Sequence, residues 1–218
     1  MVSVIATIKM PVHSKPSASR RLKSSNVANR VRLIGGTWRS RMIEFPDADG
    51  LRPTASRVRE TLFNWLGQSL HGKHCLDLFS GSGALGFEAA SRGATKVVML
   101  ETQPAAILVL KENQRKLEAT MCRIAAIDAL KFLCTAIQKF DVVFVDPPFA
   151  SSLMVPVLRE LTASLAEDAM VYTEWHMPIG EVLANLPEVG WEVVKKGRAG
   201  AVHFALLRLA ASYHETPI

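Results

Sequence analysis

The stretch Asp141–Phe149 reads Asp-Val-Val-Phe-Val-Asp-Pro-Pro-Phe. Its apolar run, Val142–Val145, predicts a strand buried on both faces, and the prolines end that strand because they cannot donate to a sheet ladder. The residue before each proline is held extended, so the carbonyls of Asp146 and Pro147 project in fixed directions. Such acceptors beside the ring of Phe149 suit a flat substrate that carries an amino group. A strand cap with a buried phenylalanine is the alternative.

On both sides of this stretch, apolar strands alternate with amphipathic helices. This alternation predicts an α/β fold, a Rossmann-like, seven-stranded and mostly parallel sheet with helices on both faces. Gly197–Gly200 joins the last two strands as a turn, so we expect the final strand to be antiparallel. The predicted strands are Cys75–Phe79, Lys96–Leu100, Met121–Ile127, Asp141–Val145, Met170–Thr173, Trp191–Lys196 and Val202–Leu209, and the predicted helices are Leu85–Ser91, Pro104–Leu117, Ala129–Gln138, Leu153–Leu165 and Ile179–Leu186.

A smaller N-terminal unit precedes this domain. Val31–Ile34 and Trp38–Phe45 flank Gly35-Gly36 and predict a β-hairpin, and apolar residues at helical spacing predict a helix over Ala55–Leu66. The expected division is a disordered basic arm at 1–30, a hairpin and helix at 31–72, a catalytic domain at 73–210 and a tail at 211–218. A transit peptide would have the same composition as the arm, which is basic, contains serine and lacks acids.

Composition narrows the class of protein. The chain has 218 residues and a net charge of +6, and residues 1–30 carry six Lys or Arg but no acid. This excess of basic residues near the N-terminus favours a polyanionic partner, although a soluble surface rich in arginine would have the same composition. The three cysteines lack any shared spacing, which favours free thiols in a cytoplasmic protein and argues against a disulfide or a metal site. No apolar run is long enough to cross a membrane, and no apolar stripe suggests more than a monomer.

A second cluster of motif residues follows the first strand of the main domain. Gly81-x-Gly83-x-x-Gly86 has the spacing of a dinucleotide-binding turn, and Glu101 ends the next strand about 20 residues on. Asp77, just before the turn, would repel a pyrophosphate but would welcome a cofactor with a cationic amino-acid portion. Asp128 follows the third strand. Each acid has a helix-capping alternative, yet all are predicted at one sheet edge together with Asp146.

These residues resemble, in order, the motifs of class I S-adenosylmethionine-dependent methyltransferases. Asp146-Pro147-Pro148-Phe149 is similar to the branch that methylates exocyclic amines. Val31–Gly36 and Leu51–Leu66 resemble the bacterial 16S rRNA guanine-N2 methyltransferase family of the RsmD type, and the likeness extends to about residue 209. It implies S-adenosylmethionine as cofactor, held by Asp77, Phe79, Gly81, Gly83, Glu101, Asp128 and Ala129, with Asp146, Pro147, Pro148 and Phe149 as the catalytic residues.

The resemblance also implies a substrate. It points to a guanine in 16S rRNA, presented as free RNA, as the small ribosomal subunit or as an assembly intermediate. We expect an RNA-binding platform from the hairpin and first helix, made of Trp38, Arg39, Arg41, Arg52, Thr54, Arg57 and Arg59. An N6-adenine methyltransferase acting on DNA or RNA uses the same tetrad and is the alternative. A nicotinamide oxidoreductase is disfavoured by Asp77 and by the tetrad.

Overall fold

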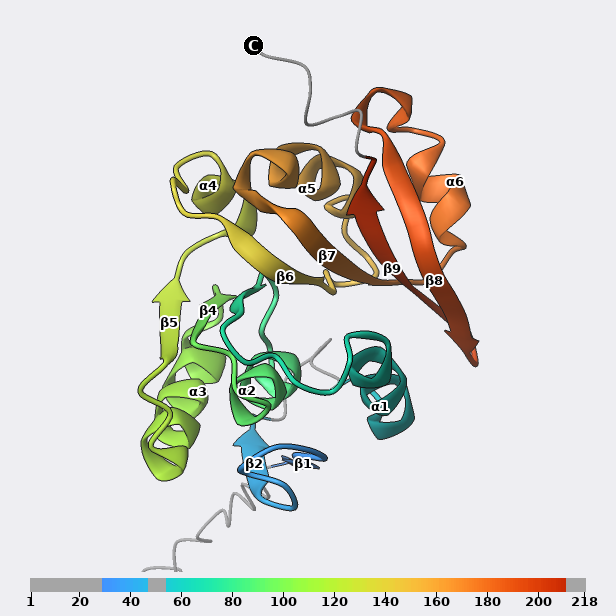
Figure 1. The fold of residues 1–218 in the computed structure, drawn as a ribbon. Coiled ribbons are helices and arrows are strands. Elements are labelled where there is room, and N and C mark those ends of the chain that lie inside the picture. Colours follow the sequence, from blue (N-terminus) through green and yellow to red (C-terminus); the bar gives the residue numbers. More distant parts are fainter. Residues whose placement is uncertain (1–28, 47–53, 211–218) are drawn as a thin grey trace, which may run out of the picture.

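The central sheet orders its strands as β5-β4-β3-β6-β7-β9-β8 (Figure 1). The computed structural model describes residues 29–46 and 54–210. The five strands β5, β4, β3, β6 and β7 run parallel to one another, whereas β9 is antiparallel to both of its neighbours, β7 and β8. The predicted fold is therefore confirmed. The strands are β3 (His74–Asp77), β4 (Lys96–Glu101), β5 (Cys122–Ala126), β6 (Phe140–Val145), β7 (Leu165–Trp175), β8 (Trp191–Ala199) and β9 (Val202–Leu209).

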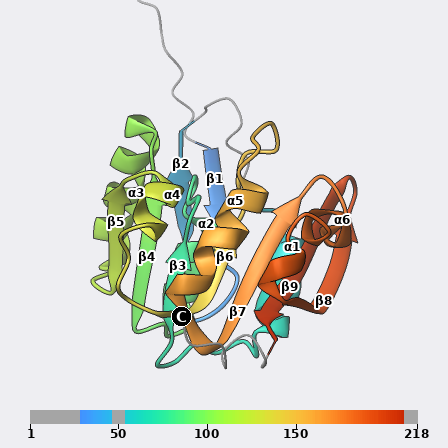
Figure 2. The ribbon, with the colours of Figure 1, turned by 90° about the horizontal axis from the view of Figure 1, so that it is seen from above.

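Strand β6 divides its side chains between two hydrophobic cores. Val142 and Phe144 pack toward α1, α2 and α3, while Val143 and Val145 pack toward α4, α5 and α6. Both faces are covered, which is why this strand is apolar at every one of these positions. Seen from above, α4, α5 and α6 lie in a row across the sheet (Figure 2). The helices are α1 (Ser56–Trp65), α2 (Ala84–Ser91), α3 (Pro104–Leu117), α4 (Ala129–Leu133), α5 (Met154–Glu160) and α6 (Ile179–Leu183).

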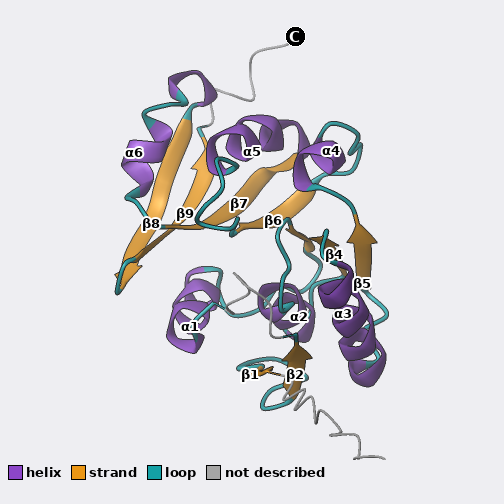
Figure 3. Cartoon of the chain, turned by 180° about the vertical axis from the view of Figure 1, so that it is seen from behind, coloured by secondary structure: helices purple, strands orange, loops and turns teal. Residues whose placement is uncertain are grey.

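The N-terminal hairpin pairs β1 (Asn29–Arg32) with β2 (Met42–Phe45) beneath α2, apart from the central sheet (Figure 3). Its first strand begins two residues before the predicted start, so Asn29 and Arg30 belong to the hairpin and not to the arm. The rest of the predicted arm and the tail 211–218 lie outside the described residues.

The two glycines of the hairpin have a packing role. Gly36 has φ +71°, and a Cβ there would collide with the backbone carbonyl of Ser91 at the end of α2. The amide of Thr37 donates to the same carbonyl at 2.8 Å. The glycine pair therefore lets the hairpin loop dock closely on the C-terminal end of α2.

Three predicted helices are shorter in the structure. Helix α4 ends at Leu133, where the hydroxyl of Thr135 bonds back to the carbonyls of Lys131 and Phe132. Helix α5 gives way to a 3₁₀ turn, η1 (Leu161–Ser164), after which β7 starts earlier than predicted. Helix α6 ends before a second 3₁₀ turn, η2 (Pro187–Val189). Within the described residues, no helix is long and apolar enough to cross a membrane.

Candidate active site

A cavity of about 730 Å³ lies at the carboxyl ends of the parallel strands. The chain passes from β3 to β4 and β5 on one side and returns to β6 and β7 on the other, and open α/β sheets bind ligands at such a switch. Nine of the eleven residues predicted for cofactor binding and catalysis line this cavity. They are Phe79, Gly81, Glu101, Asp128, Ala129, Asp146, Pro147, Pro148 and Phe149.

The other two, Asp77 and Gly83, form the support beneath the cavity. The Asp77 carboxyl is 2% exposed and accepts the Gly86 amide at 3.1 Å. Burial raises the pKa of Asp77 to about 7, although the amides of Gly86 and Phe79 oppose the rise. Gly83 has φ +79°, and a Cβ there would come within 2.6 Å of Leu110. The turn is therefore restricted to glycine at this point, and the carboxyl is buried behind it.

Glu101 fixes the glycine turn from the end of β4. Its Oε2 accepts the amide of Gly81 at 2.9 Å, and its Oε1 accepts the amides of Thr102 and Gln103 at 2.7 and 2.8 Å. Both lone pairs of Oε1 are therefore used, but Oε2 accepts a single amide and can still accept one hydroxyl hydrogen from a ligand. This geometry suits one hydroxyl of a ribose.

Asp128 has two structural roles at the end of β5. It is the N-cap of α4, and its Oδ1 accepts the Lys131 amide at 3.1 Å. The helix-capping alternative is therefore confirmed, and the same residue lines the cavity beside Ala129. We call the side formed by Asp77, Glu101 and Asp128 the β3–β5 half of the cavity.

Asp146 and Phe149 begin the opposite side, which we call the β6–β7 half and define as Asp146–Phe149 together with Glu174. The hydroxyl of Thr54 donates to Asp146 Oδ2 at 3.4 Å. Enclosure by protein raises the pKa of Asp146 well above its usual range, and the nearby carboxyls of Glu174 and Asp77 add to the rise. The Phe149 ring is 43% exposed and packs edge-on against Trp175, with the ring centroids 5.8 Å apart. A face of this ring is thus available for stacking.

Glu174 is a cavity residue that sequence reasoning missed. It lies near the end of β7, is 8% exposed and accepts the Tyr172 hydroxyl at 2.8 Å. Burial raises the pKa of Glu174, and that hydrogen bond opposes the rise. A signal was present in the sequence, because a lone acid directly follows the apolar strand predicted to end at Thr173, as Asp146 follows β6.

The structure separates the residues predicted to bind RNA. The prediction for Arg59 is wrong, because its guanidinium is fully buried and pairs with Glu88 at 3.5 Å. Burial lowers the pKa of Arg59, while Glu88 opposes that effect. Thr54 is also buried and contacts Asp146. Arg52 lies outside the described residues.

Arg59 joins three segments of the chain. Besides Glu88 of α2, its guanidinium donates to the carbonyl of Thr54 at 3.2 Å and to that of Arg32 in β1 at 2.9 Å. Glu88 also pairs with Arg92 at 2.9 Å. Arg59 therefore positions Thr54, whose hydroxyl contacts Asp146.

Trp38, Arg39 and Arg41 are in the hairpin loop, apart from the cavity. Trp38 is half-buried and its amide donates to Ser91 Oγ, at the end of α2 opposite the glycine turn. An eight-residue helix is about 12 Å long, which sets the distance between this loop and the cavity. Arg39 and Arg41 are exposed on the same loop, and Arg41 donates to the Lys116 carbonyl. Arg57 is exposed on α1 and, unlike these three, lies between Ala55 and Val58, which line the cavity.

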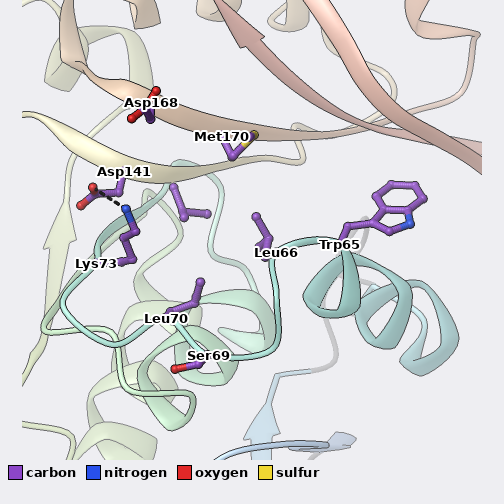
Figure 4. A pocket seen from close by; sticks show the side chains of 9 residues that line it. Trp65, Leu66, Ser69, Leu70, Lys73, Asp141, Asp168 and Met170 are labelled. Atoms are coloured by element: carbon purple, nitrogen blue, oxygen red, sulfur yellow. Dashed lines mark hydrogen bonds and ion pairs between the residues drawn. The ribbon is translucent and has the colours of Figure 1, made fainter.

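A second cavity, of about 240 Å³, lies at the amino end of β6 (Figure 4). Trp65, Leu66 and Met170 line it together with Asp141, whose carboxylate pairs with Lys73 at 3.1 Å. It contains none of the predicted site residues.

Comparisons with known proteins identify the family. A family model described as conserved hypothetical protein 95 matches residues 31–208. The ribosomal RNA small subunit methyltransferase D of Escherichia coli K12 is 39% identical over 188 residues, which cover 84% of this chain and 92% of the relative. The protein of that name from Haemophilus influenzae is 38% identical over 195 residues, 86% of this chain and 98% of the relative.

Solved structures give the same result. The putative methyltransferase yhhF from Escherichia coli superposes with a TM-score of 0.73 at 36% identity, covering 84% of this chain and 99% of that one. A putative methylase from Haemophilus influenzae superposes with a TM-score of 0.66 at 34% identity, over 82% and 98% of the two chains. The chain therefore belongs to this family, the RsmD type of class I S-adenosylmethionine-dependent methyltransferases.

Proposed function

We propose that the protein methylates the exocyclic N2 amine of a guanine in 16S rRNA of the small ribosomal subunit, with S-adenosylmethionine as the methyl donor. The observation that carries this proposal is the β6–β7 half of the cavity. There the acceptors of Asp146 and Pro147 lie beside the open ring of Phe149, in the same cavity as Glu101 and Asp128. The relatives that are named ribosomal RNA small subunit methyltransferases support RNA as the substrate.

The β3–β5 half fits the proposed cofactor. Asp77 is a buried carboxyl behind the glycine turn, and Gly81 of that turn lines the cavity, so the methionine portion could lie against its backbone. Glu101 would accept a ribose hydroxyl through Oε2, and Asp128 with Ala129 would contact the adenine. When bound, S-adenosylmethionine supplies a methyl group on a positively charged sulfur.

The residues of the β6–β7 half would orient the target amine. Its lone pair is delocalised into the guanine ring, so hydrogen bonds from its N–H groups to Asp146 and to the Pro147 carbonyl direct the remaining lone pair into the cavity. Phe149 would stack on the base, which has to leave its helix or loop to enter. Positioning accounts for most of the acceleration, and Asp146 can accept the proton that the amine releases.

The setting of the reaction follows from the substrate. Ribosomal subunits are assembled in the cytoplasm, so we place the enzyme there. The large apolar side chains that are exposed in the described part of the chain are scattered over separate elements, which supports a monomer: Met42, Leu108, Ile137, Phe149 and Val193.

The decisive experiment is methylation of small-subunit RNA from cells that lack the gene. We expect the protein to transfer labelled methyl groups to 16S rRNA, as free RNA or in the subunit, and mass mapping to locate the product as N2-methylguanine. Duplex DNA should incorporate no label. Product at adenine N6 would establish the alternative activity and overturn this proposal.

A further inference from the structure

Glu174 lies beside the proposed catalytic carboxyl. Strands β6 and β7 are parallel, and Val145 pairs with Thr173, so the next residues, Asp146 and Glu174, are lateral neighbours at the strand ends. Neighbouring strands are about 4.8 Å apart. Both carboxyls line the same cavity, and the charge of Glu174 acts directly on Asp146.

The other contacts of Glu174 leave one oxygen available. The Tyr172 hydroxyl donates to Oε2 at 2.8 Å, whereas Oε1 accepts no hydrogen bond in the described part of the chain. In the sheet, β6 and β7 lie on the side of β3 away from Glu101 and Asp128. Glu174 therefore lies on the substrate side of the cavity, to which β8 and β9 contribute the apolar Ala199 and Val202.

Two hydrogen-bond acceptors side by side match the Watson–Crick edge of guanine. Guanine presents its N1–H donor next to its N2 amine. Adenine and cytosine also present an amine, but the neighbouring ring nitrogen, N1 or N3, is an acceptor. An acceptor opposite a carboxylate is repelled and leaves that buried carboxylate without a partner, which is costly.

We infer that Glu174 accepts the N1–H of the target guanine while Asp146 and the Pro147 carbonyl hold its N2 amine, so that Glu174 selects guanine over adenine. This inference rests on the proposed function. It assigns to Glu174 a contact with the base, separate from the orientation of the amine. A site built to bond a donor rejects analogues that lack it, so the effect of Glu174 is on base selectivity more than on the rate for guanine.

The test uses substrate RNA in which the methylated guanine is replaced by 2-aminopurine, introduced by ligation. This base keeps the N2 amine but has an acceptor at N1. For the wild-type protein we expect kcat/KM to be about 100-fold higher with guanine. In Glu174→Gln the amide can donate to N1 of 2-aminopurine, so the preference should fall below about tenfold. The matched control is Glu192→Gln, an exposed acid on β8, which should keep the wild-type preference.

Binding provides a second readout that does not depend on turnover. The affinities of the two RNAs for each protein, measured with S-adenosylhomocysteine present, should show the same loss of preference in Glu174→Gln, even if this variant turns over slowly. An unchanged preference in binding and in any measurable turnover would overturn the role of Glu174. Equal use of both RNAs by the wild-type protein would overturn it as well. A wild-type protein that methylates no guanine would instead refute the proposed function.

Discussion

The carboxyl groups in the two halves of the cavity accept hydrogen bonds from different kinds of donor. In the β3–β5 half, the acids accept backbone amides: Asp77 from Gly86, Glu101 from Gly81 and Asp128 from Lys131. In the β6–β7 half, Asp146 and Glu174 accept side-chain hydroxyls from Thr54 and Tyr172. The amide donors of the first half lie 9, 20 and 3 residues from their acceptors, within one strand–turn–helix–strand unit or one helix cap. In the second half Tyr172 is two residues from Glu174, but Thr54 is 92 residues from Asp146, so its contact depends on correct docking of the N-terminal segment. The first half is therefore built from contacts close in sequence, whereas Asp146 depends on tertiary structure.

The largest expected effect is the loss of the carboxylate that orients the amine. We expect Asp146→Ala, which removes the acceptor altogether, to lower the rate of methyl transfer about 1000-fold, because preorganised electrostatic contacts to a reacting group have effects of this size. Calorimetry should find the affinity for S-adenosylmethionine within a few-fold of the wild-type value, since the variant leaves the β3–β5 half intact. Turnover close to the wild-type rate would refute the assignment of Asp146.

The contacts of Arg59, which hold Thr54 beside Asp146, can be removed without changing a residue of the β6–β7 half. Arg59→Met breaks a buried ion pair and releases Thr54, and it should lower the free energy of unfolding in urea by about 3 kcal/mol. Arg57→Met, on the exposed face of the same helix, is the matched control and should change that free energy by no more than about 0.5 kcal/mol. Equal stability of the two variants would show that the Arg59 contacts are unimportant.

The aromatic wall of the β6–β7 half should have a smaller effect. Phe149→Ala removes a stacking surface and is expected to lower kcat/KM for RNA about 30-fold, as stacking of a base on an aromatic ring contributes about 1–3 kcal/mol. Its unfolding midpoint should change little, because the ring is 43% exposed. A large loss of stability with unchanged kcat/KM would show that Phe149 is a packing residue.

The role of Asp77 in the β3–β5 half can be tested by the pH dependence of cofactor binding. Burial raises the pKa of Asp77 to about 7, so the carboxyl is largely neutral at pH 6 and largely ionised at pH 8. An ionised carboxylate attracts the cationic cofactor, so calorimetry should find about tenfold tighter binding of S-adenosylmethionine at pH 8 than at pH 6. Asp77→Asn should abolish this dependence. Asp128→Asn is the control that should preserve it, and a dependence that survives in Asp77→Asn would have another source.

The sequence was most informative where the contacts are local. The glycine turn, Asp77 and Glu101 were predicted together because strand, turn and helix follow one another along the chain. The strand ending at Asp146 was predicted from its prolines. Arg59 was misassigned because its position beside Val58 on a helix suggested a solvated face, while its partner Glu88 is 29 residues away on another helix. Contacts of that kind have no local signature.

The contacts of Arg59 also determine which truncated fragments of this protein can fold. A fragment that began at Ala55 would contain every residue lining the cavity, yet it would lack the carbonyls of Arg32 and Thr54 that accept from the guanidinium. It would also lose the Ile34 amide, which donates to Glu88 at 2.8 Å. The cut would leave buried polar groups without partners, so the hairpin cannot be treated as a detachable module. Proteolytic removal of this segment should unfold the region around α1 and α2, and a minimal folded unit has to include the hairpin strand that carries Arg32.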